Sequence, residues 1–156
     1  MSEQEAPRIR VLTWNVHSGI GPDGRYDLKR VVDLVRSHNP DIVALQEIDS
    51  RGKGETSPFS FLAQSLGSHA AEAKTILAPD GYYGHALISR WPMGEIALHD
   101  LSIYRREPRC AIETTVATPC GPLHLATVHL GLGWHERRQQ AAMLAAETSG
   151  LMALPW

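Results

Sequence analysis

A carboxylate, an amide and an imidazole stand where apolar segments of this sequence end, and these side chains could support metal-assisted chemistry. Glu47 follows the apolar run at residues 42–45, Asn15 ends an earlier run, and His129 ends a later one. Mg²⁺ takes oxygen ligands and keeps several waters, so one or two carboxylates and a substrate phosphate suffice to bind it. A histidine at a strand end can donate to a phosphate oxygen or carry a proton. On spacing alone, however, a carboxylate such as Glu47 is more often solvated or capping a turn.

The elements around Asn15 and Glu47 predict a β-α-β unit. An apolar, β-branched strand runs over residues 9–16, and a helix capped by Asp27 carries apolar residues at helical spacing until Asn39-Pro40. Residues 41–48 form a second strand, apolar on both faces, as expected of a covered parallel strand. A right-handed crossover makes the two strands parallel. We therefore expect Asn15 and Glu47 at one sheet edge, where α/β proteins usually bind ligands.

The rest of the chain is expected to be mixed. Ser57-Pro58 predicts the start of a short helix that ends at Leu66, before Gly67. We predict strands near residues 72–78, 83–89 and 94–101 with antiparallel neighbours, a hairpin at 110–118 and 122–130, and a helix from Trp134 until Ser149-Gly150. His129 then lies where the hairpin ends.

Length and composition indicate one globular domain. The chain has 156 residues, of which 43% are hydrophobic and 21% charged. Residues 1–7 are expected to be a flexible N-terminus, and the sequence shows neither a membrane span nor a signal peptide, so the expected compartment is the cytoplasm. Cys110 and Cys120 fit reduced thiols better than a disulfide or a zinc site.

Charge argues weakly against tight binding to duplex nucleic acid, because the net charge is −2 and the pI about 6.4. Two local arginine clusters, Arg105-Arg106 with Arg109 and Arg137-Arg138, could still contact a phosphate. The sequence lacks a His-Glu-x-x-His motif, a phosphate-binding glycine loop and a Gly-x-Ser-x-Gly elbow, which excludes several classes of hydrolase.

The order of the motifs resembles the endonuclease/exonuclease/phosphatase superfamily, over about residues 8–147. The matching segments are Thr13-Trp14-Asn15-Val16-His17, Pro40 to Glu47, Tyr83 to Arg90, Glu107-Pro108-Arg109, and Thr127-Val128-His129-Leu130-Gly131 with Arg137 and Gln140 beyond. Five ordered motifs are far more specific than any one of them. The resemblance implies an α/β fold, a partial four-layer α/β sandwich of the deoxyribonuclease-like type with a central mixed sheet and flanking helices.

The resemblance also implies roles for individual residues. Glu47 would ligate Mg²⁺, with Mn²⁺ as a possible substitute, and Asn15 would lie beside the metal and its phosphate. His129 would bind the scissile phosphate and stabilise its developing charge. Arg109 and His85 are candidate phosphate contacts, although the family most often has asparagine at the position of His85. The substrate would be a phosphoester of a lipid, a nucleotide or a nucleic acid.

Two later motifs of the family, Gly-Asp-Phe-Asn and Ser-Asp-His, have no counterpart here. The domain assigned to residues 8–156 would lack its C-terminal part, including the water-activating aspartate, and would form the first sheet and only a little of the second. An uncovered apolar sheet face would favour self-association. Two hypotheses follow: a fragment or truncated product of a metal-dependent phosphoester hydrolase, or a non-catalytic phosphate-binding or interaction module.

Overall fold

The computed structural model describes residues 8–54 and 57–148. Its elements are β1 (Val11–Asn15), the 3₁₀ turn η1 (His17–Gly19), α1 (Leu28–Ser37), β2 (Ile42–Asp49), α2 (Pro58–Leu66), β3 (His69–Ala78), β4 (Gly81–Ser89), β5 (Ala97–Asp100), β6 (Cys110–Thr118), β7 (Gly121–Val128) and α3 (Trp134–Glu147). The predicted flexible segment 1–7 and the predicted helix end at Ser149-Gly150 lie outside the described residues.

The first sheet has the strand order β1-β2-β4-β3. β1 runs parallel to β2, with Val11 opposite Ile42 and Asn15 opposite Gln46, while β4 is antiparallel to both β2 and β3. The predicted helix between the parallel strands is confirmed, and Asp27 caps it by accepting the backbone N–H of Arg30 at 3.0 Å. The parallel pairing brings the ends of β1 and β2 to the same sheet edge.

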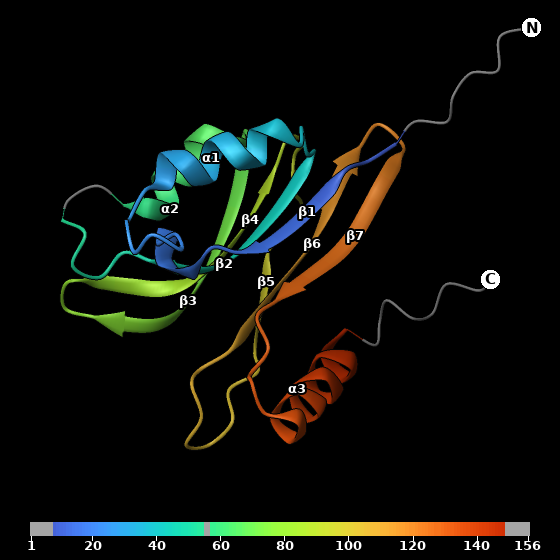
Figure 1. Ribbon diagram of the computed structural model, residues 1–156. Coiled ribbons are helices and arrows are strands. Elements are labelled where there is room, and N and C mark those ends of the chain that lie inside the picture. Colours follow the sequence, from blue (N-terminus) through green and yellow to red (C-terminus); the bar gives the residue numbers. More distant parts are fainter. Residues whose placement is uncertain (1–7, 55–56, 149–156) are drawn as a thin grey trace, which may run out of the picture.

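Helices α1 and α2 cover one face of this sheet (Figure 1). Their shared core contains side chains of α1, β2, α2 and β4, among them Val31, Val32, Val35, Val43, Leu45, Phe59, Leu62 and Ile88. The valines of α1 recur at helical spacing, so one side of the helix is apolar and packs on the sheet. This packing holds β1 and β2 in place against a helical layer.

The second sheet consists of β5, β6 and β7 in that order, all antiparallel, and the predicted hairpin is β6–β7. It packs on the other face of the first sheet, where Ile42 and Ala44 of β2 meet Ile112 and Val116 of β6 in one apolar cluster. β2 is therefore buried on both faces, as its apolar run predicted.

Two expectations about the sheets were wrong. The strand predicted at 94–101 pairs with β6 and not with its neighbour β4, because the segment after β4 already bonds β6: the backbone N–H groups of Gly94 and Ala117 donate to Thr115 and Pro92. The second sheet is also more than a small remnant, since it has three strands among the described residues. The apolar face expected to be uncovered packs on it.

Helix α3 contacts the outer side of the second sheet. Glu147 Oε2 lies 3.7 Å from His99 Nδ1 of β5, and buried Gln140 donates to the carbonyl of Leu101. The layers are thus two helices, a mixed sheet, a second sheet and a third helix (Figure 1). This is the mixed α/β fold, with a central mixed sheet and flanking helices, that the motifs predicted.

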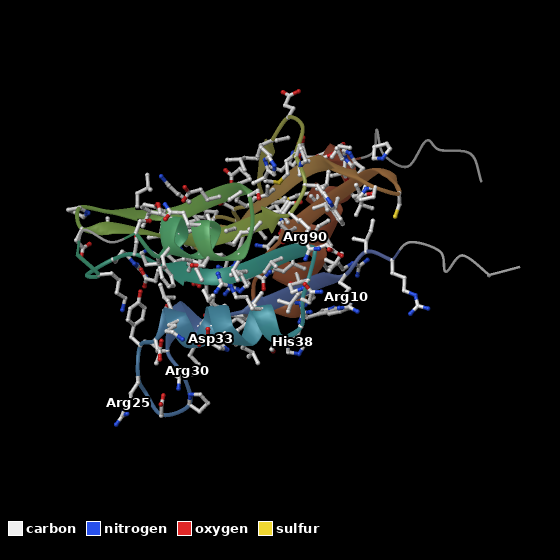
Figure 2. All side chains as sticks on the ribbon, turned by 90° about the horizontal axis from the view of Figure 1, so that it is seen from above. Arg10, Arg25, Arg30, Asp33, His38 and Arg90 are labelled. Carbon is white, nitrogen blue, oxygen red and sulfur yellow. The ribbon has the colours of Figure 1, made fainter. Side chains whose placement is uncertain are left out.

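The outer side of α1 is charged (Figure 2). Two of its cations have acidic partners, since Lys29 Nζ lies 2.6 Å from Asp33 and Arg30 lies 3.0 Å from Asp23, and Arg36 donates to the carbonyl of Ser65. This surface is therefore balanced in charge and forms no basic stripe for nucleic acid. In the part of the chain that the structure describes, no helix is long and apolar enough to cross a membrane.

Candidate active site

Glu47 lies in an irregular part of β2. Leu45 pairs with Ala86 of β4 and Ile48 with Gly84, so the register shifts between them. The backbone φ of Glu47 is +59°. A left-handed residue other than glycine costs roughly 1–2 kcal/mol, and such residues cluster at functional sites.

This β-bulge decides which way Glu47 points. Strict alternation would put its side chain on the α1 face of the sheet, with Val43 and Leu45. The extra residue instead gives that place to Ile48, which is buried in the core beneath the helices. Glu47 is thereby freed to present its carboxylate at the end of the strand.

Three side chains surround the Glu47 carboxylate. Asn15 Nδ2 donates to Oε1 at 2.7 Å, and His129 Nε2 lies 3.5 Å from the same oxygen. His17 Nδ1 lies 3.3 Å from Oε2. The structure thus brings Glu47, Asn15 and His129 together from β1, β2 and the end of β7, across the two sheets.

His17 is a neighbour of Glu47 for which the sequence predicted no role. It follows β1 in a turn of three successive left-handed residues, His17, Ser18 and Gly19, with φ values of +46°, +57° and +74°. Asn15 Oδ1 holds this turn by accepting the backbone N–H of His17 at 3.0 Å. The sequence signal that could have identified His17 is its place in the segment Trp14-Asn15-Val16-His17.

His129 is mostly neutral near pH 7. Burial lowers the pKa of its imidazole, the nearby Arg109 guanidinium lowers it further, and the Glu47 carboxylate opposes both. A neutral imidazole keeps one N–H, so it can donate one hydrogen bond without adding net charge. That suits a contact with an oxygen that becomes more negative during a reaction.

Arg109 and His85 lie deeper than solvent-facing phosphate contacts would. The side chain of Arg109 is 6% exposed, is ion-paired with Glu107, and has no hydrogen-bond partner for Nε among the described residues. A cavity of about 250 Å³ opens beside Arg109, lined also by Thr75 and Ser102. Arg109 therefore brings a positive charge close to an open space.

His85 of β4 is buried, and its Nε2 has no partner among the described residues. Burial lowers the pKa of this imidazole to about 4, and the neighbouring His129 and Arg109 contribute in the same direction. The pKa of Tyr83, on the same strand, shifts in the opposite direction: burial and the charges of Glu47 and Glu107 raise the pKa of its hydroxyl to about 12. Both groups are neutral near pH 7.

A metal at this site would be held by few protein ligands. Among residues 8–54 and 57–148, no group of three or more His, Cys, Asp or Glu side chains is arranged to hold an ion. Glu47 offers one carboxylate, and Asn15 faces it with its amide donor rather than with its oxygen. A single hard oxygen ligand fits Mg²⁺, which takes its other ligands from water and phosphate, and does not fit a structural zinc site.

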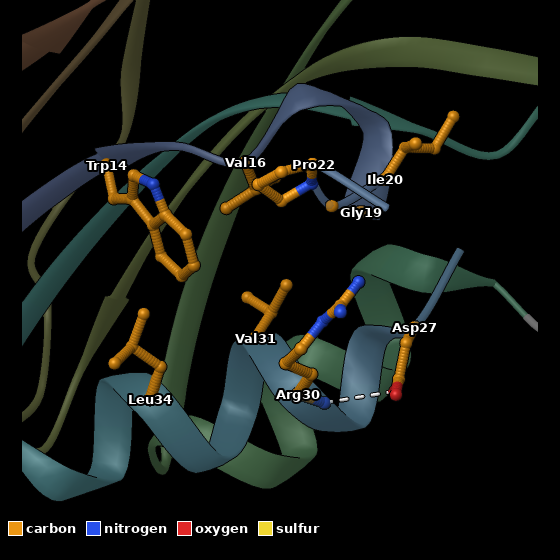
Figure 3. A pocket seen from close by; sticks show the side chains of 10 residues that line it. Trp14, Val16, Gly19, Ile20, Pro22, Asp27, Arg30, Val31 and Leu34 are labelled. Carbon is orange, nitrogen blue, oxygen red and sulfur yellow. Dashed lines mark hydrogen bonds between the residues drawn. The ribbon is translucent and has the colours of Figure 1, made fainter. Parts of the chain in front are cut away.

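A separate cavity of about 190 Å³ lies between η1 and α1 (Figure 3). It is lined mainly by apolar side chains, including Trp14, Val16, Val31 and Leu34. Successive residues of a strand face opposite sides of the sheet, so Trp14 and Val16 face α1 while Asn15 faces Glu47. This cavity therefore does not belong to the site around Glu47.

Comparison with known proteins gives this arrangement a family. The model of the Endonuclease/Exonuclease/phosphatase family matches residues 12–153. The chain belongs to this family. Over 149 residues it is also 32% identical to the uncharacterized proteins YbhP of Escherichia coli (strain K12) and of Shigella flexneri. Those alignments cover 88% of this chain and 59% of each relative, so the chain spans about three-fifths of their length.

Solved structures of the family share the fold. The endonuclease/exonuclease/phosphatase from Beutenbergia cavernae DSM 12333 superposes with a TM-score of 0.75 at 23% identity, covering 88% of this chain and 43% of that one. TDP2 of D. rerio, solved in complex with a single strand DNA product, superposes with a TM-score of 0.65 at 16% identity, covering 94% and 56%. These likenesses show that the chain has the fold of these structures.

Proposed function

We propose that this chain carries part of the active site of a Mg²⁺-dependent phosphoester hydrolase. The observation that carries the proposal is the Glu47 carboxylate, which a β-bulge aims at the end of the sheet and which Asn15 and His129 contact. The strained backbone at Glu47 lowers the stability of the folded state. The carboxylate, contacted by one amide and two imidazoles, has no evident structural role that would offset this strain.

Glu47 would hold the cation, and Asn15 would fix the carboxylate by donating to Oε1. Mg²⁺ bound there would polarise the phosphoryl group and offset its charge; Mn²⁺ accepts the same oxygen ligands. His17 borders the other carboxylate oxygen and is mostly exposed, so it faces the side from which a substrate would approach.

His129 would donate from Nε2 to a non-bridging phosphate oxygen. This requires the tautomer with the proton on Nε2, which the neighbouring Glu47 oxygen favours. Arg109 would supply a buried positive charge beside the phosphate, and His85 would lie beneath both as a neutral polar group. Charges fixed before the reaction stabilise developing negative charge most effectively.

The substrate class follows from the family only in outline. The ion-paired outer side of α1 and the net charge of −2 do not favour duplex nucleic acid, whereas the likeness to TDP2 keeps single-stranded nucleic acid in view. We propose a phosphoester of a lipid, a nucleotide or a nucleic acid, and a cytoplasmic location.

A second candidate, a non-catalytic phosphate-binding module, is favoured by one observation. Within the described residues, the carboxylates that act on the site groups belong to Glu47, Glu107 and Asp49; Glu107 is paired with Arg109, and Asp49 with Arg51. If Glu47 holds the cation, the other two are held by these arginines, and no unpaired carboxylate of this set is left to activate water. The chain alone would then bind a phosphate without turnover, and a longer form would supply the missing base, which contributes roughly 10²–10⁴-fold.

The test is hydrolysis of bis(p-nitrophenyl) phosphate in Mg²⁺ by the longest natural form of the protein that contains this chain. Glu47→Gln should lower the rate at least about 100-fold. The matched control is Glu95→Gln, an exposed carboxylate between β4 and β5. Equal rates for wild type and Glu47→Gln would overturn the metal assignment; phosphate binding without turnover would favour the second candidate.

A further inference from the structure

Large apolar side chains are exposed on two loops at one end of the second sheet. Leu132 is 90% exposed, Tyr104 84% and Trp134 72%, and only Leu77 on β3, at 75%, compares with them among the described residues. Leu132 and Trp134 lie between β7 and the first turn of α3, and Tyr104 lies between β5 and β6. Single exposed apolar residues are ordinary, whereas a group of them marks an interaction surface.

These two loops are held side by side by one buried side chain. Gln140 of α3 is 0% exposed; its Oε1 accepts the backbone N–H of Gly131 at 2.7 Å, and its Nε2 donates to the carbonyl of Leu101 at 3.3 Å. Figure 1 shows both loops at the same end of the molecule, with the start of α3. The apolar side chains therefore project from a fixed base.

The charges on this end are mainly positive. Arg105, Arg106, Arg137 and Arg138 are all exposed, and the guanidinium of Arg105 lies 5.1 Å from the ring centroid of Tyr104. Two nearby acids have other contacts. Glu107 pairs with Arg109. The carboxyl group of Glu136 lies against Gly131, so closely that a Cβ at Gly131 would be 2.0 Å from its carboxyl carbon. We call Tyr104, Leu132, Trp134 and these four arginines the tip patch.

We propose that the tip patch binds the surface of an anionic lipid bilayer. Tryptophan and tyrosine favour the headgroup region of a membrane, an exposed leucine can enter the acyl boundary, and arginines pair with anionic phosphates. The chain as a whole has a net charge of −2, so attraction to an anionic surface would be confined to this end and would orient the molecule.

A single strand of nucleic acid fits the patch less well. Such ligands bind by stacking bases on aromatic rings, but the most exposed member, Leu132, has no aromatic face, and Arg105 already lies over Tyr104. Leu132 stands three residues after His129, so a bilayer bound here would lie near the proposed site. The inference concerns binding alone and does not depend on the proposed hydrolysis.

The experiment is co-sedimentation of the 156-residue chain with vesicles of equal parts phosphatidylcholine and phosphatidylglycerol, in EDTA so that hydrolysis plays no part. Two double variants remove the two kinds of contact: Leu132→Ser with Trp134→Ser, and Arg137→Glu with Arg138→Glu. Each should weaken binding at least about tenfold, and added salt should weaken that of wild type. Vesicles of phosphatidylcholine alone should bind less protein.

The matched controls are Leu77→Ser and Arg25→Glu. Leu77 is as exposed as the patch residues but lies on β3, and Arg25 projects from the loop before α1 (Figure 2). Both controls should bind vesicles as wild type does. The proposal is overturned if wild type does not sediment with anionic vesicles, or if both double variants sediment equally well. It is also overturned if the double variants keep their binding to vesicles and lose a concentration-dependent dimer instead. The same holds if they keep vesicle binding and lose only the binding of a fluorescent oligothymidylate.

Discussion

Removing the amide of Asn15 should measurably loosen the Glu47 carboxylate. The hydrogen bond between them is 2.7 Å long and has a charged acceptor, and bonds of this kind contribute about 1.5–3 kcal/mol. The Glu47 side chain is 24% exposed, so solvent weakens the interaction. We therefore expect a coupling free energy of about 1–2 kcal/mol between the two side chains.

A double-mutant cycle isolates the coupling free energy between Asn15 and Glu47. Asn15→Ala alone also removes the bond from the backbone of His17 to Asn15 Oδ1, but that loss recurs in Asn15→Ala with Glu47→Ala and cancels. The assay is urea unfolding followed by tryptophan fluorescence, since Trp14 precedes Asn15 in β1. A coupling of about 1.5 kcal/mol corresponds to about 0.5–1 M in urea midpoint.

The reasoning fails if the losses of unfolding free energy in the two single variants simply add in the double variant. A coupling free energy below about 0.3–0.5 kcal/mol, the usual scatter of additive pairs, would mean that Asn15 does not hold the carboxylate. The same variants also report on activity: Asn15→Ala should lower it about 10–100-fold, as for other residues that orient a metal ligand.

Three further predictions concern stability. Glu47→Gly should be about 1 kcal/mol more stable than Glu47→Ala, because φ at this position is +59°, and equal urea midpoints would refute the strain. Gln140→Leu should cost about 2–4 kcal/mol, since it leaves two buried backbone groups of Leu101 and Gly131 without partners; an unchanged midpoint would contradict this. The pKa of His85 falls from 6.5 to about 4, so the folded state favours its neutral ring and stability is lost as pH falls through this range, by about 2 kcal/mol at pH 5. His85→Leu should lose about 2 kcal/mol less than wild type between pH 7 and 5, and equal losses would show that His85 does not titrate this way.

The β-α-β unit could be predicted from the sequence because local chemistry and packing agree there. The valines of α1 recur at helical spacing, and Asp27 caps the helix as expected. The run at β2 is apolar on both faces because both faces are covered. Parallel pairing of β1 and β2 predicted only that Asn15 and Glu47 lie at the same sheet edge.

The backbone of the site could not be predicted in the same way. Nothing in Leu45-Gln46-Glu47 indicates that the extra residue of a bulge falls there, because glutamate has no preference for a positive φ. The contact of His17 with Glu47 could not be predicted, since it depends on the left-handed turn after β1. The separation of β4 from β5 likewise depends on bonds to β6, which are distant in sequence. Self-association of the chain stays a prediction, although the sheet face from which it was predicted is covered.

The most direct test of the central claim is the Mg²⁺ dependence of phosphodiester hydrolysis in the longest natural form of the protein, for wild type and Glu47→Gln. Wild type should show a rate that rises with Mg²⁺ and saturates, is abolished by EDTA and is restored by Mg²⁺ or Mn²⁺. Glu47→Gln should retain at most about 1% of that rate and require much more Mg²⁺ to approach saturation. A variant with the wild-type rate and the wild-type Mg²⁺ requirement would show that the cation does not bind at Glu47.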